Sequence, residues 1–269
     1  MDENEKYFFD LNGYLVVENA ITPEEIKKLN EAIDNNTDRI NIRSQENSLS
    51  GTSKTLKGKQ GRGDLGGMLT WPKPWCQPFR DLLAHPKIVP YMLELLRDGY
   101  RLDHLYGIVM EKGAEGHVLH GGGTADDFTH FYQFHNGRMR CGLTVVSWVL
   151  TDCNLGDGGF ACIPGSHKSN YRTPREVALL DKNINVVQQI SAKAGSAIIF
   201  TEALTHGTMP WTADHERRSM LYKYSPGPLT YAARYLPAGV EDVLNEFSPS
   251  QRALLEPPYR PNRPSITTA

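Results

Sequence analysis

Residues 195–207 read GSAIIFTEALTHG, an apolar and β-branched run that opens after a glycine and closes at a His-Gly pair. A run of this kind between turn-forming residues predicts a buried β-strand. Five similar runs lie between residues 101 and 228: LYGIVME (105–111), CGLTVVSWVLTD (141–152), FACIPGS (160–166), INVVQQISA (184–192) and SMLYKYSP (219–226). Short strands separated by Gly, Asn and Asp are typical of an all-β sandwich or barrel. We therefore predict a mainly β fold with a jelly-roll core.

The N-terminal part predicts helices that flank this core. Residues 14–17 predict a short strand, and Thr22 followed by Pro23 and Glu25 forms a capping-box pattern that starts a helix. Apolar residues then recur at helical spacing, at Ile26, Leu29 and Ile33. A second pair of helices is expected within residues 78–98.

We expect a single domain over residues 1–269. Its helical part extends to about residue 100, the jelly-roll core covers about 101–228, and a proline-rich tail, 229–269, wraps the surface. Residues 36–70 are polar and rich in Ser, Gly and Lys, which predicts a long surface loop or lid. Arg62 and Asp64 in this segment could close over a polar substrate.

Composition excludes several classes of function. The chain of 269 residues has 29 basic and 31 acidic residues, so its net charge of −2 gives no electrostatic attraction to nucleic acid or to an anionic membrane. No apolar run approaches the ~18 residues that a membrane span needs. The N-terminal MDENEKYFFD is acidic, unlike a secretory signal, and the four cysteines form no C-x-x-C pair. We expect a cytoplasmic protein that acts on a small molecule.

Two histidines stand out as candidate metal ligands. His120 closes the run GHVLHGGG (116–123), where the glycines let the backbone bring the imidazole into a cavity. His206 ends the strand-like run quoted first, and Arg217 follows eleven residues later at the start of the next expected strand. Neutral imidazole binds metals, and a guanidinium pairs with a carboxylate through two hydrogen bonds. The alternative for Arg217 is an ordinary surface charge beside Glu216 and Arg218.

The residues GDGGFACIPGSHKSNY (156–171) and GYLVVENAITPEEIKKL (13–29), with His206 and Arg217, closely resemble the phytanoyl-CoA dioxygenase family. This family belongs to the iron(II)- and 2-oxoglutarate-dependent oxygenases, and the resemblance extends over residues 8–228. It implies a double-stranded β-helix (jelly-roll or cupin-like) core that holds one iron. It implies the following roles: His120 and His206 as iron ligands, Arg217 as partner of the far carboxylate of 2-oxoglutarate, Thr208 as its helper, Trp148 in the wall of the cosubstrate pocket, and His167 as a structural residue.

The chemistry of such a site agrees with the implied roles. Two imidazoles and a carboxylate on one face of an iron leave three positions, of which a 2-oxo acid takes two and O₂ the third. Decarboxylation of the oxo acid then drives the oxidation of a nearby C–H bond. We therefore expect an oxidoreductase, hydroxylating or related, that acts on a small polar metabolite.

The sequence departs from the family at one ligand. The usual motif is His-x-Asp, and Gly122 stands in the aspartate position. Glu202 could supply the missing carboxylate or support a ligand histidine, although four residues of straight strand would separate it from His206 by about 13 Å. Asp126 and Asp127 could also fold back.

Two other interpretations remain open. A halide such as chloride could take the position that Gly122 vacates, which would make the protein a halogenase. Alternatively, the chain could bind a small ligand without turnover.

Substrate contacts are expected from residues 61–75 and 126–140. In the second segment, His135, Arg138 and Arg140 could meet a carboxylate or phosphate of the substrate. Their alternative is a solvated strand edge, and His130 and His135 can equally be ordinary loop residues. No sequence feature indicates a coenzyme A site.

Overall fold

The computed structural model describes residues 1–122 and 128–267. Its helices are α1 (Glu3–Asn12), α2 (Pro23–Asp34), α3 (Gln77–Asp81), α4 (Val89–Leu96), α5 (Arg175–Ala178) and α6 (Pro249–Leu254). Its strands are β1 (Tyr14–Val17), β2 (Ile40–Ile42), β3 (Gly63–Leu65), β4 (Arg101–Met110), β5 (His117–His120), β6 (Tyr132–His135), β7 (Arg138–Cys141), β8 (Thr144–Val149), β9 (Gly159–Cys162), β10 (Gln188–Gln189), β11 (Ala197–Thr201), β12 (His206–Met209) and β13 (Arg217–Ser225).

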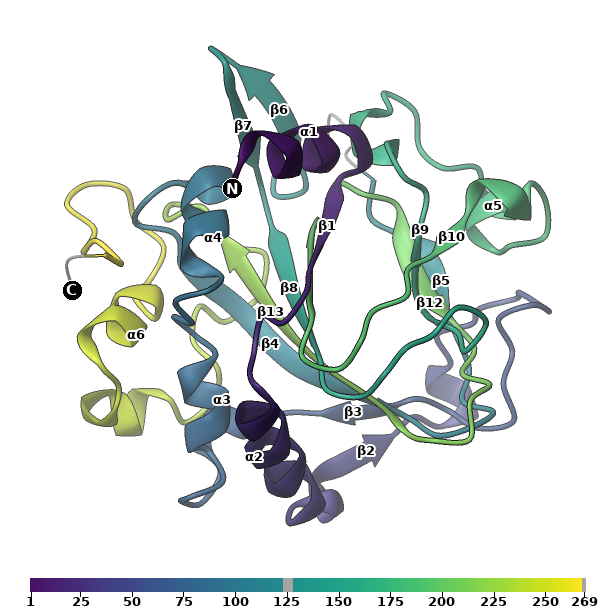
Figure 1. The fold of residues 1–269 in the computed structure, drawn as a ribbon, viewed down its shortest axis with the longest axis horizontal. Helices are drawn as coiled ribbons and strands as arrows, with labels where there is room; N and C mark the ends of the chain where they lie inside the picture. The colour runs from purple at the N-terminus through teal and green to yellow at the C-terminus, as the bar shows by residue number, and fades with distance from the viewer. Residues whose placement is uncertain (123–127, 268–269) are drawn as a thin grey trace.

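Two antiparallel sheets form the jelly-roll core. The large sheet has the strand order β1-β11-β8-β13-β4-β3-β2, and the small sheet has the order β10-β9-β12-β5. In Figure 1 the small sheet lies on one side of the large sheet, and α3, α4 and α6 lie on the other. An apolar cluster that includes Phe160, Phe200 and Leu221 fills the space between the sheets. The predicted mainly β fold with flanking helices is confirmed.

Strand β13 shows how the large sheet separates two environments. Met220, Tyr222 and Tyr224 belong to the core under the helices, whereas Leu221 belongs to the core between the sheets. Because side chains alternate along a strand, Arg217 and Lys223 point to the same side as Leu221, toward the small sheet. This alternation places two cationic side chains inside the jelly roll.

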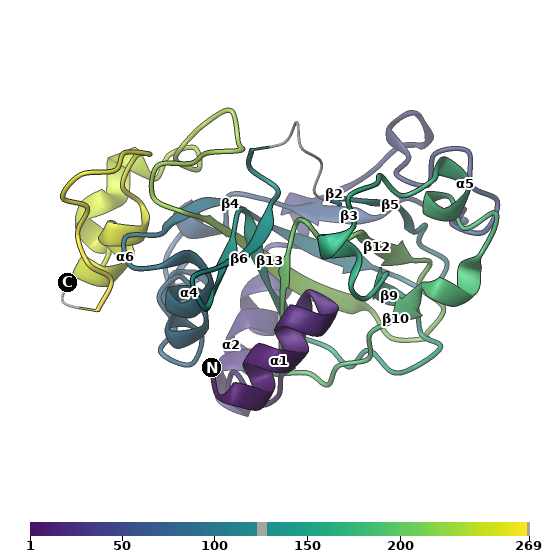
Figure 2. The ribbon, with the colours of Figure 1, turned by 90° about the horizontal axis from the view of Figure 1, so that it is seen from above.

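The helical layer follows the local sequence signals. Thr22 caps α2, and its side chain accepts a hydrogen bond from the backbone N–H of Glu25. The carboxylate of Glu25 in turn accepts from the backbone N–H of Thr22, as the capping box predicted. Leu29 and Ile33 are buried on one face of α2. The expected helix pair within residues 78–98 is present as α3 and α4. Figure 2 shows α1, α2 and α4 along one side of the molecule and the small sheet at the far end from the C-terminus.

The segment 36–70 differs from its prediction as a loop or lid. It contains β2 and β3, which pair with each other and extend the large sheet beyond β4. Arg62 is 5% exposed and is ion-paired to Asp64 at 2.8 Å, so both belong to a fixed wall of the molecule. Three helices were also not predicted: α1, the short α5 and α6 within the C-terminal tail.

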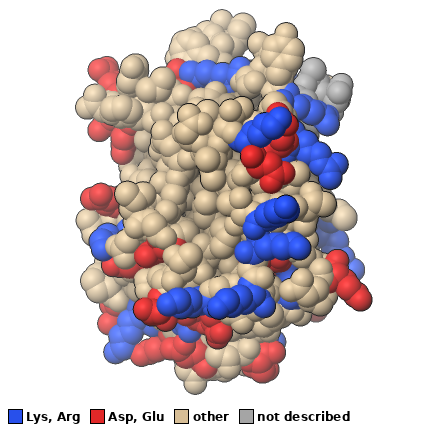
Figure 3. Space-filling view, turned by 90° about the vertical axis from the view of Figure 1, so that its right-hand side faces the viewer, with Lys and Arg blue, Asp and Glu red and all other residues tan. Residues whose placement is uncertain are grey.

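Charges of both signs share the surface. Figure 3 shows the face at the right of Figure 1, where Lys and Arg gather toward one edge and Asp and Glu lie beside and below them. This face therefore presents no field of a single sign. Within the described residues, no helix combines the length and the apolar character that a membrane crossing needs.

Candidate iron and 2-oxoglutarate site

Strand pairing brings the two predicted ligand histidines together. β5 pairs with β12 so that His120 is directly opposite His206, and the centroids of their rings are 4.4 Å apart. His120 Nδ1 lies 2.9 Å from the carbonyl oxygen of Val118, and His206 Nδ1 lies 2.7 Å from that of Leu204. A carbonyl oxygen only accepts, so each Nδ1 carries the proton and each Nε2 keeps a lone pair for a metal.

Burial keeps both imidazoles neutral. It is the largest cause that lowers the pKa of His206, to about 3, and the neighbouring His120 lowers it further. Burial also lowers the pKa of His120 below its ordinary value. At pH 7 the pair therefore has the protonation state that a metal ligand requires.

A carboxylate completes the cluster. β11 ends at Thr201, and the chain turns at once, because the backbone N–H of Leu204 bonds to the carbonyl of Thr201 at 2.9 Å. This turn carries Glu202 Oε2 to 3.7 Å from His206 Nε2. Ligand atoms of His120, Glu202 and His206 all lie within 4.8 Å of one another. The strand is therefore not straight between Glu202 and His206, and the 13 Å separation estimated from an extended chain does not apply.

Lys223 holds the carboxylate of Glu202 by one oxygen. Lys223 Nζ lies 2.6 Å from Oε1, and the two residues are 8% and 2% exposed. Burial raises the pKa of Glu202, but the charge of Lys223 and the neighbouring His206 and His120 lower it more, so it ends well below its usual range. Burial likewise lowers the pKa of Lys223 and Glu202 raises it more. Both groups are charged, and Oε2 stays available on the side of the histidines.

The glycines after His120 allow the loop to pass close to the turn at Glu202. Gly121 has φ +78°, and a Cβ there would lie 2.6 Å from the carbonyl oxygens of Glu202 and Leu204. Gly122 has φ +83°, and its N–H bonds to the carbonyl of Glu202 at 3.3 Å. An aspartate at position 122 would need a left-handed backbone, which non-glycine residues rarely adopt. The alternative carboxylates Asp126 and Asp127 lie outside the described residues.

Arg217 is a buried cation. It is 5% exposed, and its NH1 lies 3.2 Å from the sulfur of Met110. Within residues 1–122 and 128–267, no carboxylate lies at ion-pair distance from it. Burial lowers its pKa to about 10, so it stays charged at neutral pH. The surface-charge interpretation of Arg217 is wrong; Arg218 instead pairs with Glu216 and Asp34 at the surface.

Gly159, the glycine directly before Phe160, makes room for this guanidinium. Gly159 has φ +84°, and a Cβ there would lie 3.1 Å from Arg217 Nε and 2.9 Å from Cys153 Sγ. Only glycine therefore fits between these groups. The motif GDGGF, which carried part of the family resemblance, thus has a packing reason that is linked to Arg217.

Thr208 faces the same space as the histidine cluster. It follows His206 by two residues on β12, so both side chains lie on one face of the strand. It pairs directly with Phe160 of β9, which belongs to the core between the sheets. Its predicted role as a helper of Arg217 stays a prediction.

Trp148 lies on the opposite face of the large sheet from the cluster. It is fully buried in the core under the helices, and its ring meets His85 edge-on at 5.3 Å. Its partner on β13 is Met220, also in that core, whereas its neighbour Val149 faces the small sheet. The expectation that Trp148 lines the cosubstrate pocket is wrong, because alternation along β8 turns it away.

Replacing Trp148 by alanine therefore tests packing rather than cosubstrate binding. We expect a loss of about 3–5 kcal/mol in the free energy of unfolding, since a large buried ring leaves a cavity. The affinity of the remaining folded protein for 2-oxoglutarate should be that of the wild type. Thermal unfolding and a 2-oxoglutarate titration measure both quantities; a folded variant with strongly weakened cosubstrate binding would contradict the assignment.

Three of the expected substrate contacts on residues 126–140 are not at the site, although His130 of the same segment lines the cavity beside the histidine cluster. β6 and β7 form a separate hairpin, turned by Asn136 and Gly137 with φ of 53° and 71°. His135, Arg138 and Arg140 are exposed on it. None of the three lines the cavity beside the histidine cluster. Their role as substrate contacts is therefore a wrong prediction, and the solvated edge is the observed alternative.

His167 has the structural role that was expected for it. It is 4% exposed, its Nε2 donates to the backbone carbonyl of Asp10 at 3.0 Å, and its ring packs edge-on against Tyr132. These contacts join the turn after β9 to the end of α1.

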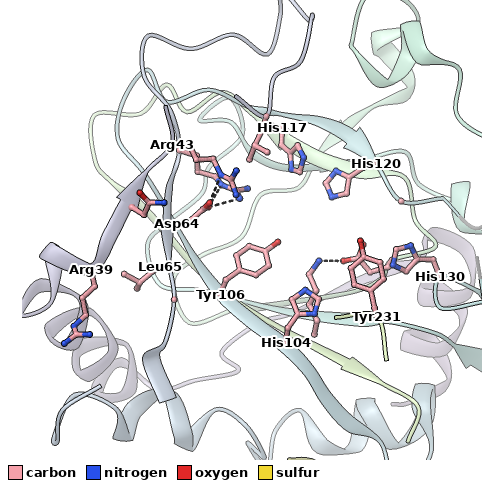
Figure 4. Close-up of a pocket in the computed structure, with 17 residues that line it drawn as sticks. Arg39, Arg43, Asp64, Leu65, His104, Tyr106, His117, His120, His130 and Tyr231 are labelled. Carbon is pink, nitrogen blue, oxygen red and sulfur yellow. Dashed lines mark hydrogen bonds and ion pairs between the residues drawn. The ribbon is translucent and has the colours of Figure 1, made fainter. Parts of the chain in front are cut away.

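A cavity of about 770 Å³ opens in front of the cluster (Figure 4). It is lined by Arg39, Asn41, Arg43, Leu49, Arg62, Asp64, Leu65, Gly66, His104, Tyr106, His117, His120, Gly121, His130, Glu202, Lys223 and Tyr231. Most of these residues were not predicted as site residues. Alternation along two strands could have found Lys223, which lies six residues after Arg217, and Tyr106, which lies two residues after His104.

Fold and site together define a jelly-roll protein with a cluster of two histidines and one glutamate, and with a buried arginine on the side of the large sheet that faces the small sheet. The chain belongs to the phytanoyl-CoA dioxygenase family, whose model matches residues 9–219. The family resemblance seen in the sequence is confirmed, and with it the general class, an iron(II)- and 2-oxoglutarate-dependent enzyme. No curated protein matches the chain significantly.

Several solved structures have a similar fold. HygX from Streptomyces hygroscopicus, with nickel, 2-oxoglutarate and hygromycin B bound, is 21% identical at a TM-score of 0.68, covering 86% of this chain and 89% of HygX. SnoK, a non-heme α-ketoglutarate-dependent carbocyclase from nogalamycin biosynthesis, is 16% identical at a TM-score of 0.59, covering 93% and 92%. The epimerase SnoN, with Fe³⁺, α-ketoglutarate and nogalamycin RO, is 16% identical at 0.60, covering 84% of each chain. These likenesses show the shared fold.

Proposed function

We propose that this protein is a non-haem iron(II)- and 2-oxoglutarate-dependent oxidoreductase that oxidises a C–H bond of a small polar metabolite. The observation that carries the proposal is the cluster of His120, Glu202 and His206, whose ligand atoms lie within 4.8 Å of one another. Two imidazole nitrogens and one carboxylate oxygen are the donor set of the facial triad that binds iron(II) and leaves positions open. The residues present therefore fit the metal.

Glu202 takes the ligand role that Asp has in the usual family motif. Its carboxylate is ionised, buried and tied by Oε1 to Lys223, so that Oε2 faces the two Nε2 atoms. Such a partner to a ligand carboxylate fixes its orientation and prevents it from rotating away. The proposal thus needs no aspartate at position 122.

The other residues position the cosubstrate and the substrate. When bound at these residues, iron(II) with 2-oxoglutarate and O₂ would supply the oxidising chemistry for the C–H bond. Arg217, buried and still charged, binds the far carboxylate of 2-oxoglutarate, with Thr208 as a neighbouring hydrogen-bond donor. The Nδ1 bonds to Val118 and Leu204 hold the two imidazoles in one tautomer. The cavity in front of the cluster admits the metabolite.

Anaerobic addition of iron(II) and 2-oxoglutarate tests this function. We expect the weak visible charge-transfer band of a chelated oxo acid in the wild-type protein. A folded protein that shows no band would contradict the proposal and leave the non-catalytic binding interpretation. Addition of chloride tests the halogenase interpretation. We expect it to change neither the band nor the product, since Glu202 supplies the carboxylate ligand. A chlorinated product would show that the protein is a halogenase.

A further inference from the structure

The cavity wall opposite the metal cluster carries two arginines that share one carboxylate. Arg43 Nε lies 2.5 Å from Asp64 Oδ2, while Arg62 Nε and NH2 lie 2.9 and 2.8 Å from Asp64 Oδ1. The backbone joins them too, because Arg43 N–H bonds to the carbonyl of Arg62 at 3.0 Å. One carboxylate balances one guanidinium, so the group keeps an excess positive charge. Each guanidinium has five N–H donors, and some of these N–H groups remain available beyond those that contact Asp64.

The summed charge of the described cavity lining has the same sign. Among its described lining residues are four cationic side chains, Arg39, Arg43, Arg62 and Lys223, and two carboxylates, Asp64 and Glu202. Because Glu202 and Lys223 balance each other at the metal cluster, the excess lies on the β2–β3 side. Iron(II) and the 2-oxoglutarate dianion add no net charge. Among the described residues, a substrate in this cavity therefore meets an excess of positive charge.

Burial makes this excess effective. The side chains of Arg62 and Arg43 are 6% and 30% exposed, so water screens them only partly. Within the described part of the chain, neither guanidinium contacts a second carboxylate. An oxyanion that accepts from the free N–H groups would make charge-assisted hydrogen bonds, which are the strong ones.

Aromatic side chains line the space between the arginines and the metal cluster. Tyr106 lies at the centre of Figure 4, with Arg43 and Asp64 to one side and His117 and His120 to the other. The rings of His104 and Tyr106 are stacked at 6.2 Å between centroids, and those of His104 and Tyr231 at 6.0 Å. The guanidinium carbon of Arg62 lies 6.0 Å from the Tyr106 ring. Aromatic faces of this kind pack favourably against a flat ring.

Resting on the proposed function, we infer that the substrate is a small anion: a cyclic, flat molecule whose carboxylate or phosphate binds the Arg43–Asp64–Arg62 network while its oxidised carbon faces the metal cluster. Phenyl phosphate and benzoate are simple probes of this chemistry, with benzylamine and benzyl alcohol as the cationic and neutral probes of the same shape. Isothermal titration calorimetry of the full chain measures all four, first without metal and then anaerobically with iron(II) and saturating 2-oxoglutarate.

We expect phenyl phosphate or benzoate to bind at least about 10-fold more tightly than benzylamine and benzyl alcohol. R43Q should weaken binding of that anion by about 10-fold or more, R43K should restore part of it, and the exposed R138Q should bind as the wild type does. Equal affinity for benzylamine, or an unchanged R43Q, overturns the inference. The inference is also overturned if 2-oxoglutarate displaces the anion and R217M abolishes its binding, because the anion would then occupy the site of the cosubstrate carboxylate.

The outcome is separable from that of the proposed function. Binding that depends on Arg43 in the metal-free protein tests only the network, whereas the charge-transfer band tests only iron and 2-oxoglutarate. Loss of the band with Arg43-dependent anion binding retained would refute the oxidoreductase and keep the anion site. A band without Arg43-dependent binding would refute the anion site alone.

Discussion

Replacing Glu202 by glutamine is expected to lower the affinity for iron(II) by at least about 100-fold and to abolish the conversion of 2-oxoglutarate to succinate. Loss of a residue that only supports a ligand typically costs 10- to 100-fold in metal affinity, and loss of a ligand itself should cost more. Glutamine keeps the shape of the side chain and can still accept from Lys223, so the fold should survive. Competition with a chelator measures the affinity, and circular dichroism checks the fold.

Lys223→Met provides the matched comparison for this variant. It removes the partner that holds Oε1 of Glu202 at 2.6 Å but leaves the carboxylate in place. Iron affinity should fall within the 10- to 100-fold range of a supporting residue, and therefore less than in Glu202→Gln. If Glu202→Gln binds iron as tightly as the wild type, the carboxylate is not a ligand, and the position left by Gly122 must be filled in another way.

The fold could be predicted where local and periodic signals coincide. The cap at Thr22 and the apolar spacing behind it are complete within one turn, and α2 begins where they indicate. β2 and β3 have only three residues each, too few for a periodic pattern, and they form by pairing at the edge next to β4. α1 was missed although a capping box between Asp2 and Glu5 marks it, because Phe9 is its only buried residue and gives no apolar period.

Site residues could be predicted only where a sequence motif or a spacing marks the individual residue. His120, His206 and Arg217 could be named from motifs and spacing. The role of Glu202 depends on where β11 ends, and the sequence AIIFTEAL continues the apolar pattern through the point where the chain turns. The Arg43–Asp64–Arg62 network could not be predicted from composition, because Arg43 and Arg62 are nineteen positions apart and meet only through the pairing of β2 with β3.

Arg217 shows why the site carries a cost in stability that its ligand offsets. A guanidinium buried without a carboxylate is unfavourable in the folded state, and its pKa is lowered to about 10 for that reason. For a base, a lowered folded-state pKa means that the cost is fully present below pH 10 and disappears only as the group loses its proton above that pH. At pH 7 the protein without 2-oxoglutarate therefore carries a buried charge that pairs with no described carboxylate and that the dianion can neutralise.

Replacing Arg217 by methionine is accordingly expected to have opposite effects on binding and on stability. Truncating one partner of a buried, hydrogen-bonded charge pair costs about 2–5 kcal/mol, so the Kd for 2-oxoglutarate should rise by roughly 30-fold or more. Iron affinity should change little, since Arg217 is not among the clustered ligands. The melting temperature without 2-oxoglutarate should stay equal or rise, and the increase that 2-oxoglutarate gives to the wild type should vanish.

The neighbouring Arg218→Met is the control for this experiment. Arg218 has ion pairs at the surface with Glu216 and Asp34, so its loss should leave 2-oxoglutarate binding unchanged and lower stability only slightly. Titrations with 2-oxoglutarate and thermal unfolding with and without it measure both variants. An Arg217→Met protein that binds 2-oxoglutarate as tightly as Arg218→Met would show that another cation, such as Arg62 in the cavity beside the histidine cluster, anchors the cosubstrate. The Arg43–Asp64–Arg62 network would then bind the cosubstrate and not the substrate, because one guanidinium network cannot bind both carboxylates at once.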